Sequence, residues 1–242
     1  MSFLTIAQDV AISVDFPPPS SAIGSADPAI KKIRRSIEAV SYALGKSHAW
    51  KTMRAEATFT SVATEVQTSM LPTGFDRFVP ETIWDRTDKT LLIGPISEVE
   101  WAGLKAFSYA DSSRRKFIQR GNTASTSILM IPVPPAGNTF GFSYVNTYFC
   151  QSSSGTAQSA WAADADISRL DAELVTLGAI SDFLWTEGMN HEKADSDFED
   201  LYNQLVKNDN PKSRAMSVAD IFGQRRHFSG APESSGNHVM TN

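Results

Sequence analysis

The chain has 242 residues and a formal net charge of −5, with 41% hydrophobic, 20% charged and 10% aromatic residues. This composition is typical of a folded globular protein and excludes a chain that is solvated throughout. One cysteine excludes a disulfide framework and a cysteine-rich zinc site, and we expect synthesis in a reducing compartment. No apolar run is long enough for a membrane-spanning helix, and the first residues lack a secretory signal pattern.

Two helices are predicted at the start of the chain. Residues 2–15 have apolar side chains at helical spacing, with Ser2 as the N-cap, and a proline triplet follows them. Asp27 and the proline after it begin the second helix, because proline fits the first helical position. Gly45 is the predicted C-cap of that helix.

The hydrophobic period then changes to that of β-strands. Residues 57–62 and 65–71 alternate or are β-branched, and they are predicted to pair as a hairpin. Ser97 is predicted to cap a short helix with acidic residues in its first turn. Three more strands are expected at 116–120, 127–132 and 139–149. Strands in such close succession predict an antiparallel sheet or small barrel.

Helical periodicity returns near the end of the chain. One helix is predicted from Asp166 to about Gly188, with Asp164 and Asp166 as acids favoured at its N-terminus. Another is predicted over 192–207. The remaining tail is rich in Ser, Gly, Asn and Pro, so we expect it to gain order only with a partner. Its one apolar island contains Met216, Val218, Ile221 and Phe222.

The predicted fold class is α+β. We expect a helical bundle formed by the N- and C-terminal helices, an inserted antiparallel β-rich domain and an extended C-terminal arm. Residues 1–54 and 160–208 are assigned to the bundle, 55–159 to the insertion and 209–242 to the arm.

Charge is divided between the two helical regions. Residues 28–54 hold seven basic residues and one acidic residue, whereas residues 160–206 hold eleven acidic and two basic residues. Such blocks attract each other, either within one subunit or between neighbours in an assembly. Nucleic acid is a rival partner for the basic block, but the acidic chain favours assembly. The predicted subunit contacts are Lys31, Lys32, Arg34, Arg35, Asp195, Asp197, Glu199 and Asp200.

No sequence pattern predicts catalysis. The phosphate-binding, dinucleotide-binding, nucleophile-elbow and zinc-helix motifs are all absent. Cys150 has no nearby histidine to activate it and is interpreted as a structural thiol. We therefore predict that the chain is not an enzyme and has no catalytic residue, cofactor or metal. Two other functions stay open: a carbohydrate-binding module that uses Trp84 or Trp101, and a hydrolase with dispersed carboxylates.

The order of several short segments after the helix that ends near Trp50 resembles a known family, the head-to-tail adaptor (connector or head-completion) proteins of the tailed-bacteriophage neck. The resemblance extends from about residue 27 to residue 207. The segments are Glu56-Ala-Thr-Phe59, Leu71-Pro-Thr-Gly-Phe75-Asp-Arg77, Thr82-Ile-Trp84-Asp-Arg86, Ile93-Gly-Pro95, Glu100-Trp101-Ala-Gly-Leu104, Ile131-Pro-Val-Pro-Pro-Ala-Gly137 and Phe142-Ser-Tyr144.

The resemblance implies a structural virion protein that is made in the host cytoplasm and located between capsid and tail. It implies a ring of identical subunits, commonly twelve, that binds the portal protein and a tail or nozzle protein. The viral genome would pass through the ring without specific binding, and no membrane is involved. A stopper or tail-completion protein is the alternative within the neck. The arm residues expected to bind the portal are Ile221, Phe222, Arg225, Arg226 and Phe228.

Overall fold

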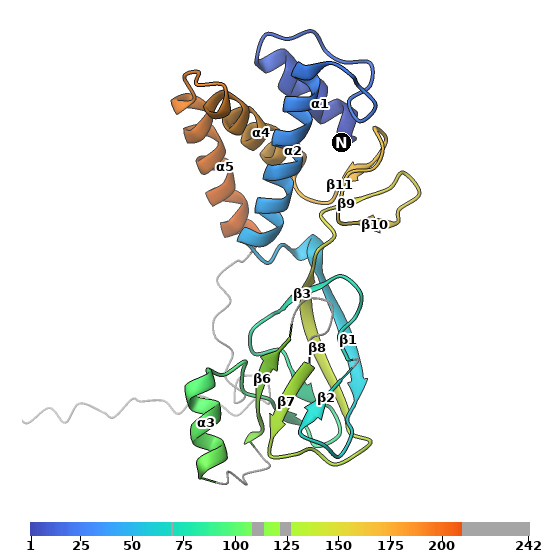
Figure 1. The fold of residues 1–242 in the computed structure, drawn as a ribbon, viewed down its shortest axis with the longest axis vertical. Coiled ribbons are helices and arrows are strands. Elements are labelled where there is room, and N and C mark those ends of the chain that lie inside the picture. Colours follow the sequence, from blue (N-terminus) through green and yellow to red (C-terminus); the bar gives the residue numbers. More distant parts are fainter. Residues whose placement is uncertain (69, 108–113, 122–126, 210–242) are drawn as a thin grey trace, which may run out of the picture.

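The computed structural model describes residues 1–68, 70–107, 114–121 and 127–209. The molecule is elongated, with most of its helices at one end and most of its strands at the other (Figure 1). The predicted α+β architecture is confirmed, because N-terminal and C-terminal helices pack together and antiparallel sheets are inserted between them in the sequence. The predicted arm, apart from its first residue, lies outside the described residues.

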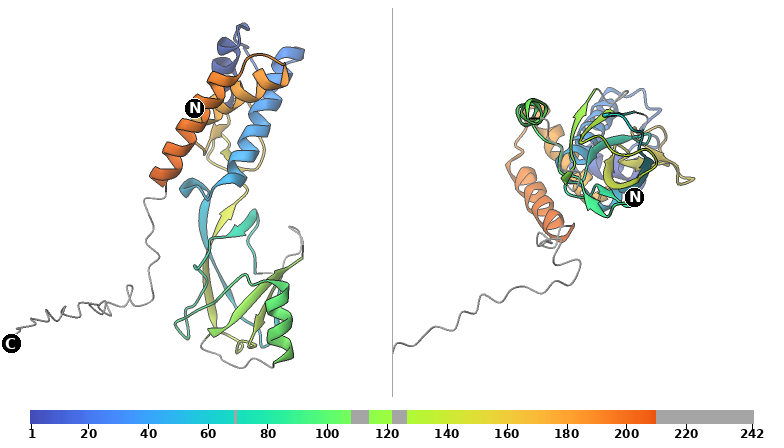
Figure 2. Two further views of the ribbon diagram at one scale, coloured as in Figure 1. Left: turned by 90° about the vertical axis from the view of Figure 1, so that its left-hand side faces the viewer. Right: turned by 90° about the horizontal axis from the view of Figure 1, so that it is seen from below.

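Helices from both ends of the described chain form the bundle (Figure 2). The helices of the whole described chain are α1 (Phe3–Ser13), α2 (Pro28–Ser47), α3 (Glu98–Ala106), α4 (Ala172–Thr186) and α5 (Glu192–Asp209), with a 3₁₀ turn η1 (Lys51–Met53) after α2. All of the α-helices except α3 belong to the bundle (Figure 1). α1 packs against α2 and α4, and α4 also packs against α2 and α5. α3 lies apart from the bundle, beside the strands (Figure 1). No helix among these is long and apolar enough to cross a membrane.

The strands form three antiparallel sheets within the described ranges. They are β1 (Arg54–Thr60), β2 (Val66–Gln67), β3 (Phe75–Phe78), β4 (Trp84–Asp85), β5 (Thr90–Leu91), β6 (Lys116–Arg120), β7 (Ser127–Ile131), β8 (Thr139–Asn146), β9 (Cys150–Gln151), β10 (Ala157–Gln158) and β11 (Ile167–Ser168). The largest sheet has β8 between β1 and β4, with β5 outside β4, and β3 also pairs with β8. The other sheets have the orders β2-β7-β6 and β10-β9-β11.

Two large hydrophobic cores correspond to the two ends of the molecule. The helical core includes side chains of α1, α2 and α4 that are at most 2% exposed: Phe3, Ile33, Ile37, Leu174 and Phe183. Phe149, Cys150 and Trp161 also belong to this core, so the small sheet β10-β9-β11 lies with the helices. The predicted boundary between residues 159 and 160 falls between β10 and β11 of this sheet.

The second core lies between the five-stranded sheet and the sheet β2-β7-β6, and it is rich in phenylalanine. Its aromatic members are Phe75, Phe78, Phe117, Phe140, Phe142 and Tyr144. The Phe78 ring lies 5.3 Å from the ring of Phe142 and 5.7 Å from that of Phe117, in both cases edge to face. Aromatic pairs of this geometry stabilise a core beyond the burial of their area. The strand end of the molecule therefore has a core of its own.

The predicted helix N-caps are confirmed, but one predicted C-cap is wrong. The side chains of Ser2, Asp27 and Ser97 each accept a hydrogen bond from a backbone N–H in the first turn of their helix. α2 continues past Gly45, which is buried. A Cβ at this glycine would lie 3.3 Å from Cε of Met53. Gly45 therefore allows the turn after α2 to pack closely against the helix.

The predicted hairpin of residues 57–62 and 65–71 is wrong, because its two strands belong to different sheets. β1 pairs with β8, and β2 pairs with β7. Ser61 separates them: its buried hydroxyl donates to the carbonyl of Pro135 at 2.6 Å. The side chain of Gln67 bonds both backbone groups of Val62, at 2.9 Å each, and so closes the loop between the strands. These hydrogen bonds turn the chain from one sheet to the other.

The helix predicted from Asp166 begins later. Asp166 is buried, and its Oδ2 accepts hydrogen bonds from the backbone N–H groups of Ala162 and Ala163, at 2.7 and 2.8 Å. It therefore holds a turn before β11. The N-cap of α4 is Asp171, whose side chain accepts from the N–H of Leu174 at 3.0 Å.

Asp164, also predicted in the first turn of that helix, instead binds the loop between α1 and α2. Its carboxylate accepts from the N–H groups of Ala22 and Ile23, at 3.0 and 2.8 Å, and from the hydroxyl of Ser21 at 2.6 Å. Partial burial opposes ionisation of Asp164, but these hydrogen bonds outweigh it and lower its pKa. The ionised carboxylate thus fastens the loop to the segment before β11.

We expect Asp164→Asn to destabilise the protein by about 1–2 kcal/mol at neutral pH, because the amide accepts weaker hydrogen bonds than the carboxylate. A carboxylate whose pKa is lower in the folded state stabilises above its unfolded pKa, and this stability is lost as pH falls through the folded pKa. The difference between wild type and variant should therefore shrink in acid. Urea unfolding at neutral and acidic pH measures it, and an unchanged difference would contradict this role of the charge.

Candidate interaction surface on the helical bundle

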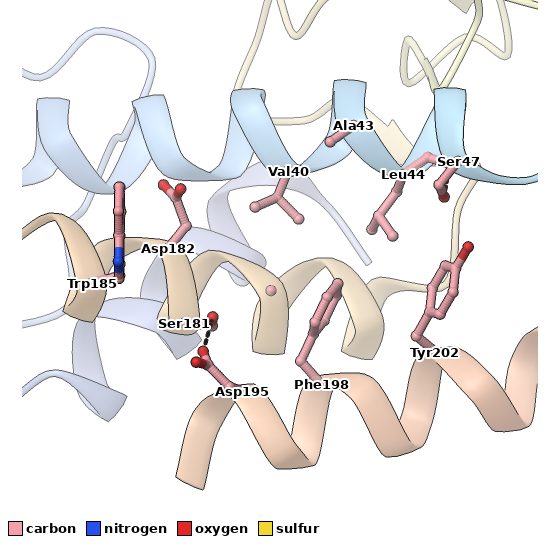
Figure 3. Close-up of a pocket in the computed structure, with 11 residues that line it drawn as sticks. Val40, Ala43, Leu44, Ser47, Ser181, Asp182, Trp185, Asp195, Phe198 and Tyr202 are labelled. Atoms are coloured by element: carbon pink, nitrogen blue, oxygen red, sulfur yellow. Dashed lines mark hydrogen bonds between the residues drawn. The ribbon is translucent and has the colours of Figure 1, made fainter. Parts of the chain in front are cut away.

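The helical bundle has a groove between α2, α4 and α5. It has a volume of about 500 Å³. α5 packs on α4 rather than on α2, and none of its residues is fully buried. Figure 3 shows Val40 and Leu44 of α2 on one side of the groove, with Phe198 and Tyr202 of α5 on the other. The groove therefore has two apolar walls.

The floor of the groove contains a glycine of α4, Gly178. A Cβ at this position would lie 2.7 Å from Cγ1 of Val40 and 2.9 Å from Cε2 of Phe198. These distances are shorter than normal carbon contacts, so a larger residue would push the two walls apart. The absence of a side chain at Gly178 thus lets α2 and α5 approach each other over α4.

The end of the groove nearest the start of α5 is acidic. Asp195 accepts a hydrogen bond from the hydroxyl of Ser181 at 2.5 Å and bonds Nδ1 of His191 at 2.6 Å. These two hydrogen bonds lower the pKa of Asp195. Asp182 lies at the same end, together with Trp185, whose side chain is 67% exposed (Figure 3). This end thus combines negative charge with an open aromatic surface.

The basic residues predicted at a subunit contact divide into two kinds. Lys32 forms an ion pair with Glu187 at 2.8 Å, and Arg34 with Glu38 at 2.8 Å. Arg34 also donates to the carbonyl of Ile23 at 3.1 Å. Lys31 and Arg35 are exposed and form no ion pair with another described residue. These two are the members of the basic set that α2 leaves available to a partner.

The acidic residues of the predicted contact divide in a similar way. Asp195 is occupied by Ser181 and His191, as described above. Asp197, Glu199 and Asp200 are exposed on α5 and form no ion pair within the described part of the chain. The bundle therefore presents a basic patch on α2, defined by Lys31 and Arg35. It also presents an acidic patch on α5, defined by Asp197, Glu199 and Asp200.

The residues predicted to bind the portal lie outside the described residues. They are Ile221, Phe222, Arg225, Arg226 and Phe228. The last described residue, Asp209, is firmly bound: its carboxylate bonds Nε2 of His48 at 2.9 Å, a guanidinium nitrogen of Arg54 at 3.2 Å and the N–H of Lys51 at 3.1 Å. This cluster, the Asp209 clamp, fixes the end of α5 at the junction between helices and strands.

The tryptophans considered for carbohydrate stacking are not equally placed. Trp101 is 3% exposed and packs with Ile118, Leu129 and Ile131. It offers no open face to a sugar ring in this structure. Trp84 lies in β4 and is half-buried. The structure therefore brings together no stacking platform from these two residues.

Cys150 has the environment of a structural thiol. It is buried, and its sulfur lies 3.3 Å from the carbonyl oxygen of Ala160 and 3.4 Å from that of Gln158. Burial, reinforced by the nearby charge of Asp166, raises its pKa to about 12, so the thiol is neutral at physiological pH. Among the described residues no three or more His, Cys, Asp or Glu side chains gather in a way that could hold a metal ion.

A buried polar cluster in the strand domain was not predicted from the sequence. Asp85 is fully buried; its Oδ2 accepts from Arg115 at 3.0 Å and from the amide of Asn138 at 2.8 Å. Its Oδ1 accepts from the N–H groups of Thr87 and Asp88 in the turn after β4. The sequence carries one local sign of this cluster: Asp85 stands two residues before Thr87, and an aspartate that accepts a hydrogen bond from the backbone two residues later is typical of turns. Arg115 and Asn138 are distant in sequence.

No protein-family model matches the sequence, and no curated protein matches it either.

Proposed function

We propose that this chain is a structural virion protein, a head-to-tail adaptor that forms a ring beneath the portal. The observation that carries the proposal is the pair of patches that form no ion pair among the described residues, basic on α2 and acidic on α5. The order of sequence segments that resembles the adaptor family supports the same role. In this role the chain acts through contacts with other proteins rather than through catalysis.

Two different patches of opposite charge suit a closed ring. A heterologous contact joins one surface of a subunit to a different surface of the next, and it closes when the rotation permits. Here Lys31 and Arg35 of one subunit would face Asp197, Glu199 and Asp200 of its neighbour. Charge complementarity of this kind fixes the register of a contact and disfavours wrong pairings.

The elongated shape suits the remaining parts of the role. The helical bundle would form the ring, and the strand domain would extend from it toward a tail or nozzle protein. The arm that follows the Asp209 clamp would reach the portal through Ile221, Phe222, Arg225, Arg226 and Phe228. DNA would pass through the ring without specific binding.

Reversing a charge in the basic patch tests the ring. We expect Arg35→Glu to weaken assembly of the full chain, with a larger defect at low than at high ionic strength, because salt screens exposed charges. Arg35 is preferable to Arg34, whose bonds to Glu38 and Ile23 lie within one subunit. Native mass spectrometry and negative-stain images of the protein, alone and with its portal, give the oligomeric state.

Lys89→Glu is the matched control, because Lys89 is an exposed residue of the strand domain outside both patches. It should assemble as the wild type does. A wild-type chain that remains monomeric in the presence of its portal would contradict the ring. A defect of Arg35→Glu that does not change with salt would contradict the charge contact.

A further inference from the structure

The groove between α2, α4 and α5 is an apolar surface without an occupant among the described residues. Val40 and Leu44 of α2 face Phe198 and Tyr202 of α5, and Trp185 stands open at the acidic end (Figure 3). A groove between two helices suits an apolar segment with side chains three and four residues apart.

The described chain ends beside this groove. The Asp209 clamp holds the end of α5 next to His48, which directly follows α2. Tyr202, at the same end of the groove, precedes Asp209 by seven residues, which is about 10 Å along the helix axis. Residues 210–216 can span at most about 23 Å. The chain after Asp209 can therefore turn back and enter the groove that its own helices form.

The sequence after Asp209 contains a segment that matches the groove in pattern. Val218, Ile221 and Phe222 stand three and four residues apart, a spacing that places side chains on one face of a helix. Residues 210–242 have four basic and two acidic residues, whereas one end of the groove is acidic. Arg225 and Arg226 follow the apolar residues, as a chain entering from the Tyr202 end requires.

We propose that residues 217–222 of the same chain occupy this groove, with Val218, Ile221 and Phe222 against its apolar walls and the following arginines beside Asp182 and Asp195. A short tether gives the segment an effective concentration in the millimolar range, so a weak contact suffices. A second copy of the chain would have to bind at its much lower bulk concentration. In the free subunit the groove thus covers residues 217–222 of the arm. A portal would have to displace these residues from the groove before it could bind them.

This proposal does not rest on ring formation, because groove and segment belong to one chain. Acrylamide quenching of tryptophan fluorescence tests it on the full chain in dilute solution. Trp185 is 67% exposed, whereas Trp50, Trp101 and Trp161 are at most 8% exposed. We expect Ile221→Ser/Phe222→Ser to raise the quenching of Trp185 about twofold, because the tethered segment no longer covers it. The same measurement on the Trp185→Phe variant shows which part of the quenching comes from Trp185.

Two substitutions on α2 form a matched pair. Ala43 and Ala39 are both exposed and one turn apart, but only Ala43 lines the groove. We expect Ala43→Glu to raise the quenching of Trp185 as the tail variant does, and Ala39→Glu to leave it unchanged. Equal quenching in wild type and Ile221→Ser/Phe222→Ser would overturn the proposal. Protection that disappears on dilution would also overturn it, because the occupant would then be a second copy.

Discussion

Arg115→Met is expected to destabilise the strand domain by about 3–5 kcal/mol, because it leaves the buried carboxylate of Asp85 without its cationic partner. Arg115 is 4% exposed, and its guanidinium donates to Asp85 at 3.0 Å and to Asp88 at 3.2 Å. Asn138 cannot replace it, since its amide already donates to both aspartates, at 2.8 and 2.9 Å. The loss should exceed that of any surface ion pair in this protein.

Urea unfolding followed by circular dichroism measures this effect. Arg120→Met is the matched control, because Arg120 is 45% exposed and its ion pair with Glu98 is on the surface, at 2.6 Å. The control should cost no more than about 1 kcal/mol. In Asp85→Asn/Arg115→Met the cost should be smaller than the sum of the single substitutions, because both remove the same interaction. A similar cost for Arg115→Met and Arg120→Met would contradict the cluster.

Features that depend on neighbours in sequence could be predicted. Ser2, Asp27 and Ser97 each cap a helix, because the bonds that they accept come from N–H groups two or three residues later. The apolar period of α2 and the proline at its start likewise fix the helix locally. For the same reason, most strand and helix positions follow from the spacing of apolar residues.

Features that depend on distant residues could not be predicted. The hairpin prediction failed because β1 finds its partner in β8, 79 to 91 residues further on, rather than in the adjacent segment. Asp166 has the sequence pattern of an acid in the first turn of a helix, yet its carboxylate accepts hydrogen bonds from the backbone of Ala162 and Ala163 in the turn before β11. The Asp209 clamp joins residues that are about 160 positions apart, so no local pattern contains it.

The candidate surface was predicted in part. The division of charge between α2 and the last two helices is a property of composition, and Lys32–Glu187 is a contact between these regions within one subunit. The sequence could not distinguish such satisfied residues from Lys31 and Arg35, because exposure depends on packing. The groove was missed entirely, since it results from how α5 packs on α4 beside α2.

Trp161 should be the most important single aromatic side chain for joining the small sheet to the helices. It is 5% exposed, and its ring lies 5.0 Å from the ring of Phe3 and 6.1 Å from that of Phe149. Its indole N–H also donates to the hydroxyl of Ser41 at 3.2 Å. These contacts connect the segment between β10 and β11 with both α1 and α2.

We therefore expect Trp161→Ala to destabilise the protein by about 3–5 kcal/mol, because it leaves a large cavity and removes the partner of a buried hydroxyl. Trp185→Ala makes the same substitution at a side chain that is 67% exposed, and it should cost no more than about 1 kcal/mol. Urea unfolding of both variants separates the two cases. If the two costs were equal, Trp161 would not hold the small sheet on the helical core, and another residue at that junction would have to do so.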